Sequence, residues 1–237
     1  SGGAVHALMG PATAIQRARG LCAPRVHVRF VLAALLLGSV TACSRPLTEA
    51  EEAFASDLFG PALDTSEVQV AQGLGITPLY RTVPTSIKRV EATDRACVRT
   101  PQPRGAQPPQ AFALGNRVHF DSDLYSSDMV LQWPEGLRIP QALVLAHELT
   151  HVWQWQNRTR TGYSPARAVA ESWQVADPYF SDGEEAFFTL GYEQQAAIVE
   201  DFVCFTFANP DHPRQAELRA ILEPVLPVAE FEAALGR

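Results

Sequence analysis

The sequence predicts an α+β fold in which two long helices pack with a small sheet. Apolar residues recur at helical spacing through residues 137–157 and again from Tyr192 to Phe207, as they do on the buried face of a helix. Residues 66–72 and 117–121 instead alternate between apolar and polar side chains, which is typical of strands with one buried face. A chain of 237 residues, 46% of them hydrophobic, has enough apolar surface for a sizeable core.

Residues 1–43 are predicted to precede the folded domain. Basic residues at Arg25 and Arg29 are followed by an apolar run from Phe30 to Val40. The length of this run fits the core of a signal peptide and is short for a membrane span. A short core helix is the alternative, but the basic flank and the terminal position favour the signal peptide. Residues 44–237 are then expected to form one domain.

The end of the apolar run predicts a lipid anchor. It continues as VTAC, which resembles the bacterial lipobox, whose cysteine is lipidated and becomes the new N-terminus. We therefore expect a periplasm-facing lipoprotein of the cell envelope, attached to the membrane through a lipid on Cys43. Because Ser44 rather than an aspartate follows the cysteine, the outer membrane is the expected location.

Charge and cysteine content restrict the expected partners and bonds. The formal net charge is −7, without a basic cluster, so nucleic acid is not an expected partner. Once Cys22 is removed and Cys43 carries lipid, Cys97 and Cys204 remain. The periplasm would permit a disulfide between them. Two unlinked buried thiols are an equal alternative, because the sequence does not place their Cα atoms.

Local signals predict the first elements of the domain. Thr48 and Glu51 have the spacing of a capping box at the start of a helix that ends at Gly60. The alternating residues 66–72 form the next predicted strand. Residues 99–110 contain four prolines and one glycine, which predicts an exposed loop.

The later elements follow in the same way. The turn signal LGN precedes the predicted strand at residues 117–121. Pro140 suits the first position of the first long helix, and Asn157 is expected to end that helix. A short helix from Pro165 to about Trp173, the second long helix and a last helix within residues 214–226 complete the domain.

The first long helix carries the pattern HExxH. His147 and His151 are one helical turn apart, so their ring nitrogens can converge on one ion. Zinc suits two imidazoles and one carboxylate, with a fourth position open for water. Glu148 lies about 100° around the helix and is placed to act as a general base on that water. The alternative, two core histidines with other partners, is hard to sustain on a long apolar helix.

The third ligand is expected from the second long helix. Glu193 and Glu200 are seven residues apart and therefore share one face of that helix. An acidic residue on the inward face of an apolar helix needs a partner, and a zinc ion would supply one. The residues alone leave open which glutamate is the ligand, and a solvated helix face is the alternative for each.

The stretches HELTHVWQ and YEQQA together resemble the gluzincin metallopeptidases, whose third ligand is a glutamate on the helix after HExxH, often in an E-x-x-A context. EQQA matches this context, so the resemblance implies Glu193 as the ligand. These enzymes often carry an aspartate four residues later that orients a histidine. Here that position is Ala197, and Glu200 or Asp201 is expected to substitute for the aspartate.

Most of the predicted mature chain is also similar to the small Vgr-related proteins of proteobacteria, encoded near type VI secretion loci. The shared stretches are LTEAE, FGPALDTSEVQV, LGNRVHF, HELTHVWQ and YEQQAAIVEDF. The resemblance implies a zincin-like minimal metallopeptidase domain with a metal site, and it suggests a partner in secretion or the cell envelope. The predicted lipoprotein signal departs from a cytoplasmic role in secretion.

These observations predict a zinc metallopeptidase that hydrolyses a peptide or protein substrate. The edge strand, expected around Val118 to Phe120, would pair with an extended substrate. His119, Tyr163 and Tyr192 are the candidates for stabilising the oxyanion. Two alternatives are a non-catalytic interaction module linked to secretion or the cell envelope, and a cell-wall amidase. The intact Glu148 favours an enzyme, because a structural metal site has no use for a base there.

Overall fold

The computed structural model describes residues 44–73, 97, 110–174 and 186–236. The chain divides into two compact units, Ser1–Ala42 and Cys43–Arg237, and every described residue belongs to the second. The predicted signal peptide, the lipid site Cys43 and residues 99–109 of the predicted loop lie outside the described residues. Within the described part of the chain, seven α-helices and a mixed four-stranded sheet confirm the α+β class.

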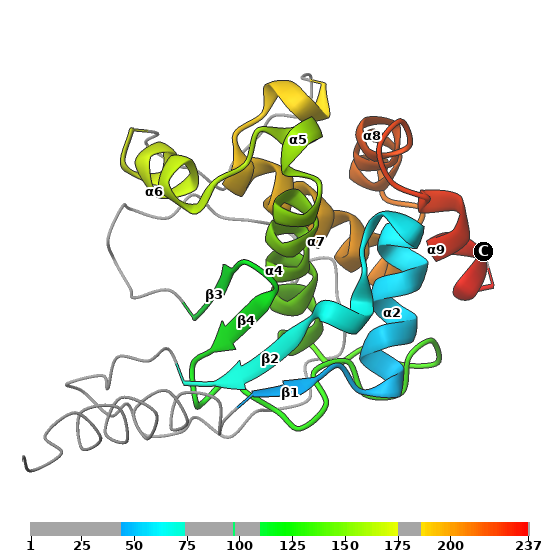
Figure 1. Ribbon diagram of the computed structural model, residues 1–237. Coiled ribbons are helices and arrows are strands. Elements are labelled where there is room, and N and C mark those ends of the chain that lie inside the picture. Colours follow the sequence, from blue (N-terminus) through cyan, green and yellow to red (C-terminus); the bar gives the residue numbers. More distant parts are fainter. Residues whose placement is uncertain (1–43, 74–96, 98–109, 175–185, 237) are drawn as a thin grey trace, which may run out of the picture. The chain divides into compact units, whose positions relative to one another are not determined.

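The described elements follow one another along the chain in an order that Figure 1 shows. They are β1 (Ser44–Pro46), α2 (Glu49–Phe59), η1 (Gly60–Ala62), η2 (Thr65–Glu67), β2 (Gln69–Gln72), β3 (Ala111–Leu114), β4 (Arg117–Phe120), α4 (Gln141–Gln156), α5 (Arg158–Thr161), α6 (Pro165–Gln174), η3 (Phe187–Thr189), α7 (Tyr192–Ala208), α8 (Pro213–Leu222) and α9 (Val228–Ala234). The predicted helices and strands are confirmed to within a few residues, whereas β1, β3, α5 and α9 had not been predicted. None of the described helices combines the length and the apolar character needed to cross a membrane.

Helix α2 begins and ends as the sequence predicts. The Thr48 hydroxyl accepts a hydrogen bond from the Glu51 N–H at 3.2 Å, and the Glu51 carboxylate accepts one from the Thr48 N–H at 2.9 Å. These two bonds complete the capping box. At the other end, Gly60 has a φ of +57°, a region of backbone conformation that favours glycine.

The strand order in the sheet is β1-β2-β4-β3, with β2 and β4 parallel and the two outer pairs antiparallel. Gly115, with a φ of +61°, lies in the turn between β3 and β4. Strand β4 therefore has a partner on each side. The expectation that Val118 to Phe120 forms the edge strand is wrong, because residues Ala111–Leu114 fold back and pair with it. Among the described strands, β3 is the edge on that side.

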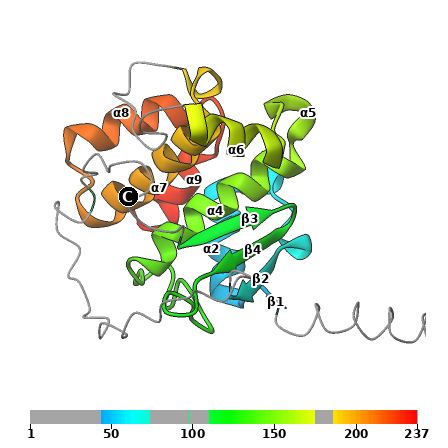
Figure 2. The same cartoon turned by 90° about the vertical axis from the view of Figure 1, so that its left-hand side faces the viewer.

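Helix α4 lies between the sheet and α7 (Figures 1 and 2). Side chains on all sides of the helix are buried, and only Val144 is partly exposed between Gln141 and Gln154, as expected for a helix covered on both faces. Pro140 is the residue before the helix, not its first residue as expected. Asn157 ends the helix as predicted, and its side-chain amide donates to the Trp153 carbonyl at 2.9 Å.

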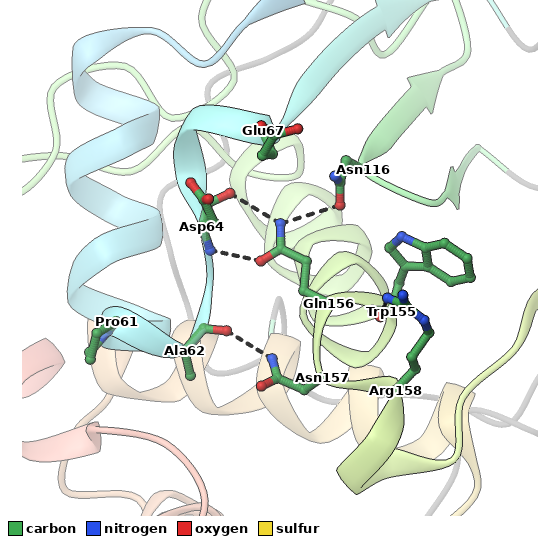
Figure 3. Close-up of a pocket in the computed structure, with 9 residues that line it drawn as sticks. All are labelled: Pro61, Ala62, Asp64, Glu67, Asn116, Trp155, Gln156, Asn157 and Arg158. Atoms are coloured by element: carbon green, nitrogen blue, oxygen red, sulfur yellow. Dashed lines mark hydrogen bonds between the residues drawn. The ribbon is translucent and has the colours of Figure 1, made fainter.

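Hydrogen bonds join the end of α4 to the segment that follows α2 (Figure 3). The Gln156 side chain accepts from the Asp64 N–H at 2.7 Å and donates to the Asp64 carbonyl at 3.1 Å. It also donates to the Asn116 side chain at 3.3 Å, and Asn157 donates to the Ala62 carbonyl at 2.8 Å. These groups line a hollow of about 360 Å³, which no residue of the HExxH pattern lines.

The structure decides between the two alternatives for the remaining cysteines. Cys97 and Cys204 form a disulfide, with Cα atoms 5.5 Å apart and both side chains buried. The bond joins positions 107 residues apart in the sequence. Since Cys204 belongs to α7, the disulfide holds the second long helix to a distant part of the chain.

Candidate metal centre

Helices α4 and α7 bring His147, His151 and Glu193 together. The Glu193 Oε2 atom lies 3.2 Å from His147 Nε2 and 3.3 Å from His151 Nε2. One potential ligand atom from each residue lies within 4.8 Å of the other two, so the cluster could hold a metal ion. Its donors are two imidazole nitrogens and one carboxylate oxygen, a set that zinc accepts.

Glu200 contacts the other nitrogen of the His147 ring. Its Oε2 atom lies 3.2 Å from His147 Nδ1, whereas Glu193 faces Nε2. A carboxylate at Nδ1 accepts the hydrogen there and leaves the Nε2 lone pair directed toward the cluster. The geometry therefore separates the two glutamates: Glu193 belongs to the cluster, and Glu200 supplies the orienting carboxylate expected from either Glu200 or Asp201.

The charges of the cluster depend on one another. Burial lowers the pKa of His147, but hydrogen bonds to Glu193 and Glu200 outweigh burial and raise that pKa to about 10. Burial also opposes ionisation of Glu193, yet the two histidines hold the pKa of its carboxyl well below the usual range. The carboxylate is thus ionised and needs positive charge beside it, which imidazole protons or a metal cation can provide.

Glu148 is buried next to the cluster without using all its hydrogen-bonding capacity. Its side chain is 5% exposed, and its Oε2 atom has no hydrogen-bond partner among the described residues. Burial raises the pKa of this carboxyl, and the positive charges of His147 and His151 oppose the rise. A buried carboxylate oxygen without a partner costs stability. The donor set and this unpartnered oxygen both fit a metal ion with a water molecule beside it.

A chain of two buried glutamines, Gln154 and Gln195, contacts the His151 ring at its Nδ1 atom. The His151 Nδ1 atom lies 2.8 Å from Gln154 Oε1. Gln154 Nε2 donates to Gln195 Oε1 at 2.9 Å and to the Tyr192 carbonyl at 3.2 Å. Gln195 Nε2 in turn donates to the Leu190 carbonyl at 2.9 Å. These residues were not predicted from the sequence, although two glutamines at inward positions of apolar helices were a usable signal.

Tyr163 is the oxyanion candidate that lies beside the cluster. It is buried, and its ring stacks on His151 with centroids 5.9 Å apart. Burial, followed by the negative charges of Glu193 and Glu148, raises the pKa of its hydroxyl. The phenol is therefore held in its protonated form, as a hydrogen-bond donor requires.

The other two oxyanion candidates contact other groups, and the Tyr192 ring meets the Tyr163 ring edge-on, with centroids 5.2 Å apart. The Tyr192 hydroxyl lies beside Gly162. The His119 ring stacks on Phe112 with centroids 4.7 Å apart, and its Nδ1 atom lies 3.2 Å from the Gly73 carbonyl. Of the three candidates, Tyr163 is the one whose ring stacks on a residue of the cluster.

The fold and the site define an α+β protein with a candidate metal centre of two histidines and one glutamate on neighbouring helices. Its sequence matches no protein-family profile and no curated protein sequence. A similar solved structure is the effector domain of Pseudomonas aeruginosa VgrG2b, with 21% sequence identity and a TM-score of 0.46, covering 86% of this chain and 99% of that chain.

Proposed function

We propose that the protein is a zinc-dependent metallopeptidase with a zincin-like minimal domain. The observation that carries the proposal is the buried Glu148, whose unpartnered oxygen lies next to a cluster of two histidines and one glutamate. A metal site that only stabilised the fold would not need this costly carboxylate. An enzyme that activates water needs a base in this place.

The residues of the site have different roles in the proposed reaction. His147, His151 and Glu193 would hold the ion, which when bound supplies an electrophile that makes a water molecule acidic near neutral pH. Glu148 accepts a proton from the attacking water and passes it to the leaving amine. Burial of Glu148 suits the first of these two transfers, because the raised pKa of its carboxyl strengthens it as a base.

Tyr163 is the residue we assign to the oxyanion. Its hydroxyl stays protonated beside Glu193 and Glu148, and its ring rests on His151. A donor held in place before reaction stabilises the negative charge that develops on the carbonyl oxygen of the substrate.

The substrate we propose is a peptide or protein in extended conformation. Strand β3 is the edge strand on one side of the described sheet, and such an edge can pair with an added strand. Attachment to the outer membrane through Cys43 and a partner in secretion or the cell envelope belong to the same proposal, and they rest on the sequence motifs.

The decisive experiment compares the wild type with Glu148→Gln. The amide keeps the shape of the side chain but cannot accept the proton, so we expect normal zinc content and hydrolysis of peptides slower by about 10²–10⁴-fold. Zinc is measured on the same samples, and His147→Ala, expected to lose zinc, serves as the control. Full activity of Glu148→Gln would refute the mechanism. A wild type that binds zinc but cleaves no peptide or glycopeptide would favour the non-catalytic interaction module.

A further inference from the structure

We propose that Gln154 and Gln195 form a hydrogen-bond relay that determines which nitrogen of His151 faces the metal and also positions Glu193. The inference rests on the proposed function only in that the cluster binds a metal ion. Both glutamines are buried, with exposed fractions of 0% and 3%, so water does not compete for their hydrogen bonds. Gln154 and Gln195 are positioning residues, because they act through the ligands.

The direction of the relay follows from the group at its end. A carbonyl oxygen only accepts hydrogen bonds, so the Gln195 atom that faces the Leu190 carbonyl is the amide nitrogen. The Gln195 oxygen then faces Gln154 and needs a donor, which is the Gln154 nitrogen. The same nitrogen donates to the Tyr192 carbonyl, which confirms the orientation of the amide. The Gln154 oxygen is left facing His151 Nδ1, which must therefore carry a hydrogen.

The hydrogen on Nδ1 leaves Nε2 as the metal-binding atom of His151. A neutral imidazole has one donor nitrogen and one acceptor nitrogen, and the relay assigns these roles. The Nε2 atom is the one that lies 3.3 Å from Glu193 Oε2, inside the cluster. His147 reaches the same state through the Glu200 carboxylate at its Nδ1. One ligand is therefore oriented by a charged group, and the other by a neutral chain of amides that ends on the backbone.

The relay also joins the first turn of α7 to α4. Gln154 belongs to α4, and its two α7 partners, Tyr192 and Gln195, lie on either side of Glu193 in the sequence. A change at Gln154 would therefore disturb His151 and Glu193 together, two of the three candidate ligands. This coupling accounts for a long amide at a fully buried position of the helix.

Two substitutions at Gln154 separate the relay from a general packing role. Gln154→Met keeps the length of the side chain and removes the acceptor for His151, so we expect zinc affinity to fall by about 10–100-fold. Gln154→Glu keeps an oxygen for His151 Nδ1 but places its other oxygen against the Tyr192 carbonyl and Gln195 Oε1. It should therefore bind zinc more tightly than Gln154→Met while unfolding at the same or a lower temperature. A packing role alone would make zinc affinity follow stability.

A matched control lies on the same helix. Gln156→Met removes the hydrogen bonds to Asp64 and Asn116 shown in Figure 3, two residues along α4 and away from the cluster. We expect this variant to bind zinc as the wild type does, whatever its effect on stability.

The measurements are zinc affinity by competition with a chelator and the ring-nitrogen signals of ¹⁵N-labelled histidine in the zinc-loaded protein. The His151 signals are identified by their absence in His151→Ala. The wild type and Gln154→Glu should show a protonated Nδ1 and a metal-bound Nε2, and Gln154→Met should lose this single pattern. Failure of the wild type to bind zinc, a metal-bound Nδ1, or unchanged affinity in Gln154→Met would each overturn the proposal. No turnover is measured, so a missing peptidase activity would refute the proposed function without affecting this test.

Discussion

The two glutamates of α7 contact different nitrogens of the His147 ring, so they have different roles. Glu193 lies 3.2 Å from Nε2, and Glu200 lies 3.2 Å from Nδ1. A carboxylate on the Nε2 side borders the position that the ion would occupy. A carboxylate on the Nδ1 side holds the ring and makes it a stronger ligand. The common helix face of the two residues therefore does not make them equivalent.

This difference predicts the order of their effects on metal binding. Glu200→Gln keeps an oxygen that can accept from His147 Nδ1, so zinc affinity should fall by no more than about 10–100-fold. Glu193→Gln replaces an ionised carboxylate next to both histidines and should weaken zinc binding more strongly. Competition with a chelator measures both variants. If Glu193→Gln bound zinc normally and Glu200→Gln did not, the assignment of the third ligand would be wrong.

The first strand and the first helix are joined through one buried carboxylate. Glu51 is 0% exposed and forms a bidentate ion pair with Arg45 of β1, at 2.6 and 2.8 Å. The same carboxylate accepts from the Thr48 N–H and from the Met129 N–H. Glu51 therefore connects three segments, while the Thr48 hydroxyl caps the helix and donates to the Asp128 carboxylate at 3.0 Å.

We expect two substitutions in the capping box to lower the free energy of unfolding by different amounts. Thr48→Ala should lower the free energy of unfolding by about 1 kcal/mol, the usual loss of a helix cap. Glu51→Ala should lower it by about 3 kcal/mol, at the lower end for a broken buried ion pair, because the Arg45 side chain is 22% exposed and reaches water. Urea unfolding gives both values.

The control for this pair is Glu52→Ala on the exposed side of the same helix. It should change stability by less than about 0.5 kcal/mol. Equal losses in Thr48→Ala and Glu51→Ala would mean that the ion pair adds nothing to the cap.

Across the whole described domain, packing holds α4 between the sheet and α7. A disulfide adds a covalent link to α7. The disulfide from Cys97 to Cys204 ties α7 to a residue 107 positions earlier in the chain. The last helix, α9, is held by an aromatic cluster in which Phe231 stacks on Trp133 at 4.9 Å and meets the edge of Phe54 at 5.9 Å. Contacts between distant residues thus complete the domain around the candidate metal centre.

The disulfide should contribute measurably to the stability of the domain. Cross-linking so long a loop restricts the unfolded chain, and we expect Cys97→Ala to lower the free energy of unfolding by about 2–4 kcal/mol. Unfolding in urea with and without a reducing agent checks this expectation. Reduction should destabilise the wild type to a similar degree and leave Cys97→Ala unchanged. A wild type whose stability is indifferent to reduction would contradict the prediction.

The sequence by itself determined the long helices, the capping box of α2 and the strand β4. It also predicted that His147, His151 and Glu193 come together, although it reached Glu193 only through a resemblance. These features depend on spacing within one element, and helical and strand periodicities can be read from neighbouring residues. The α+β class followed from the same patterns.

The tertiary structure alone decided which groups meet across elements. It placed β2 beside β4, paired Cys97 with Cys204, and put the Glu200 carboxylate at Nδ1 of His147. It also built the relay from Gln154 to Gln195, for which the local pattern indicates buried glutamines but not their partners. Strand order, disulfide pairing and the facing of side chains depend on contacts between residues far apart in the chain. Such contacts are set when the apolar faces of the elements are buried together, and the spacing within each element does not encode them.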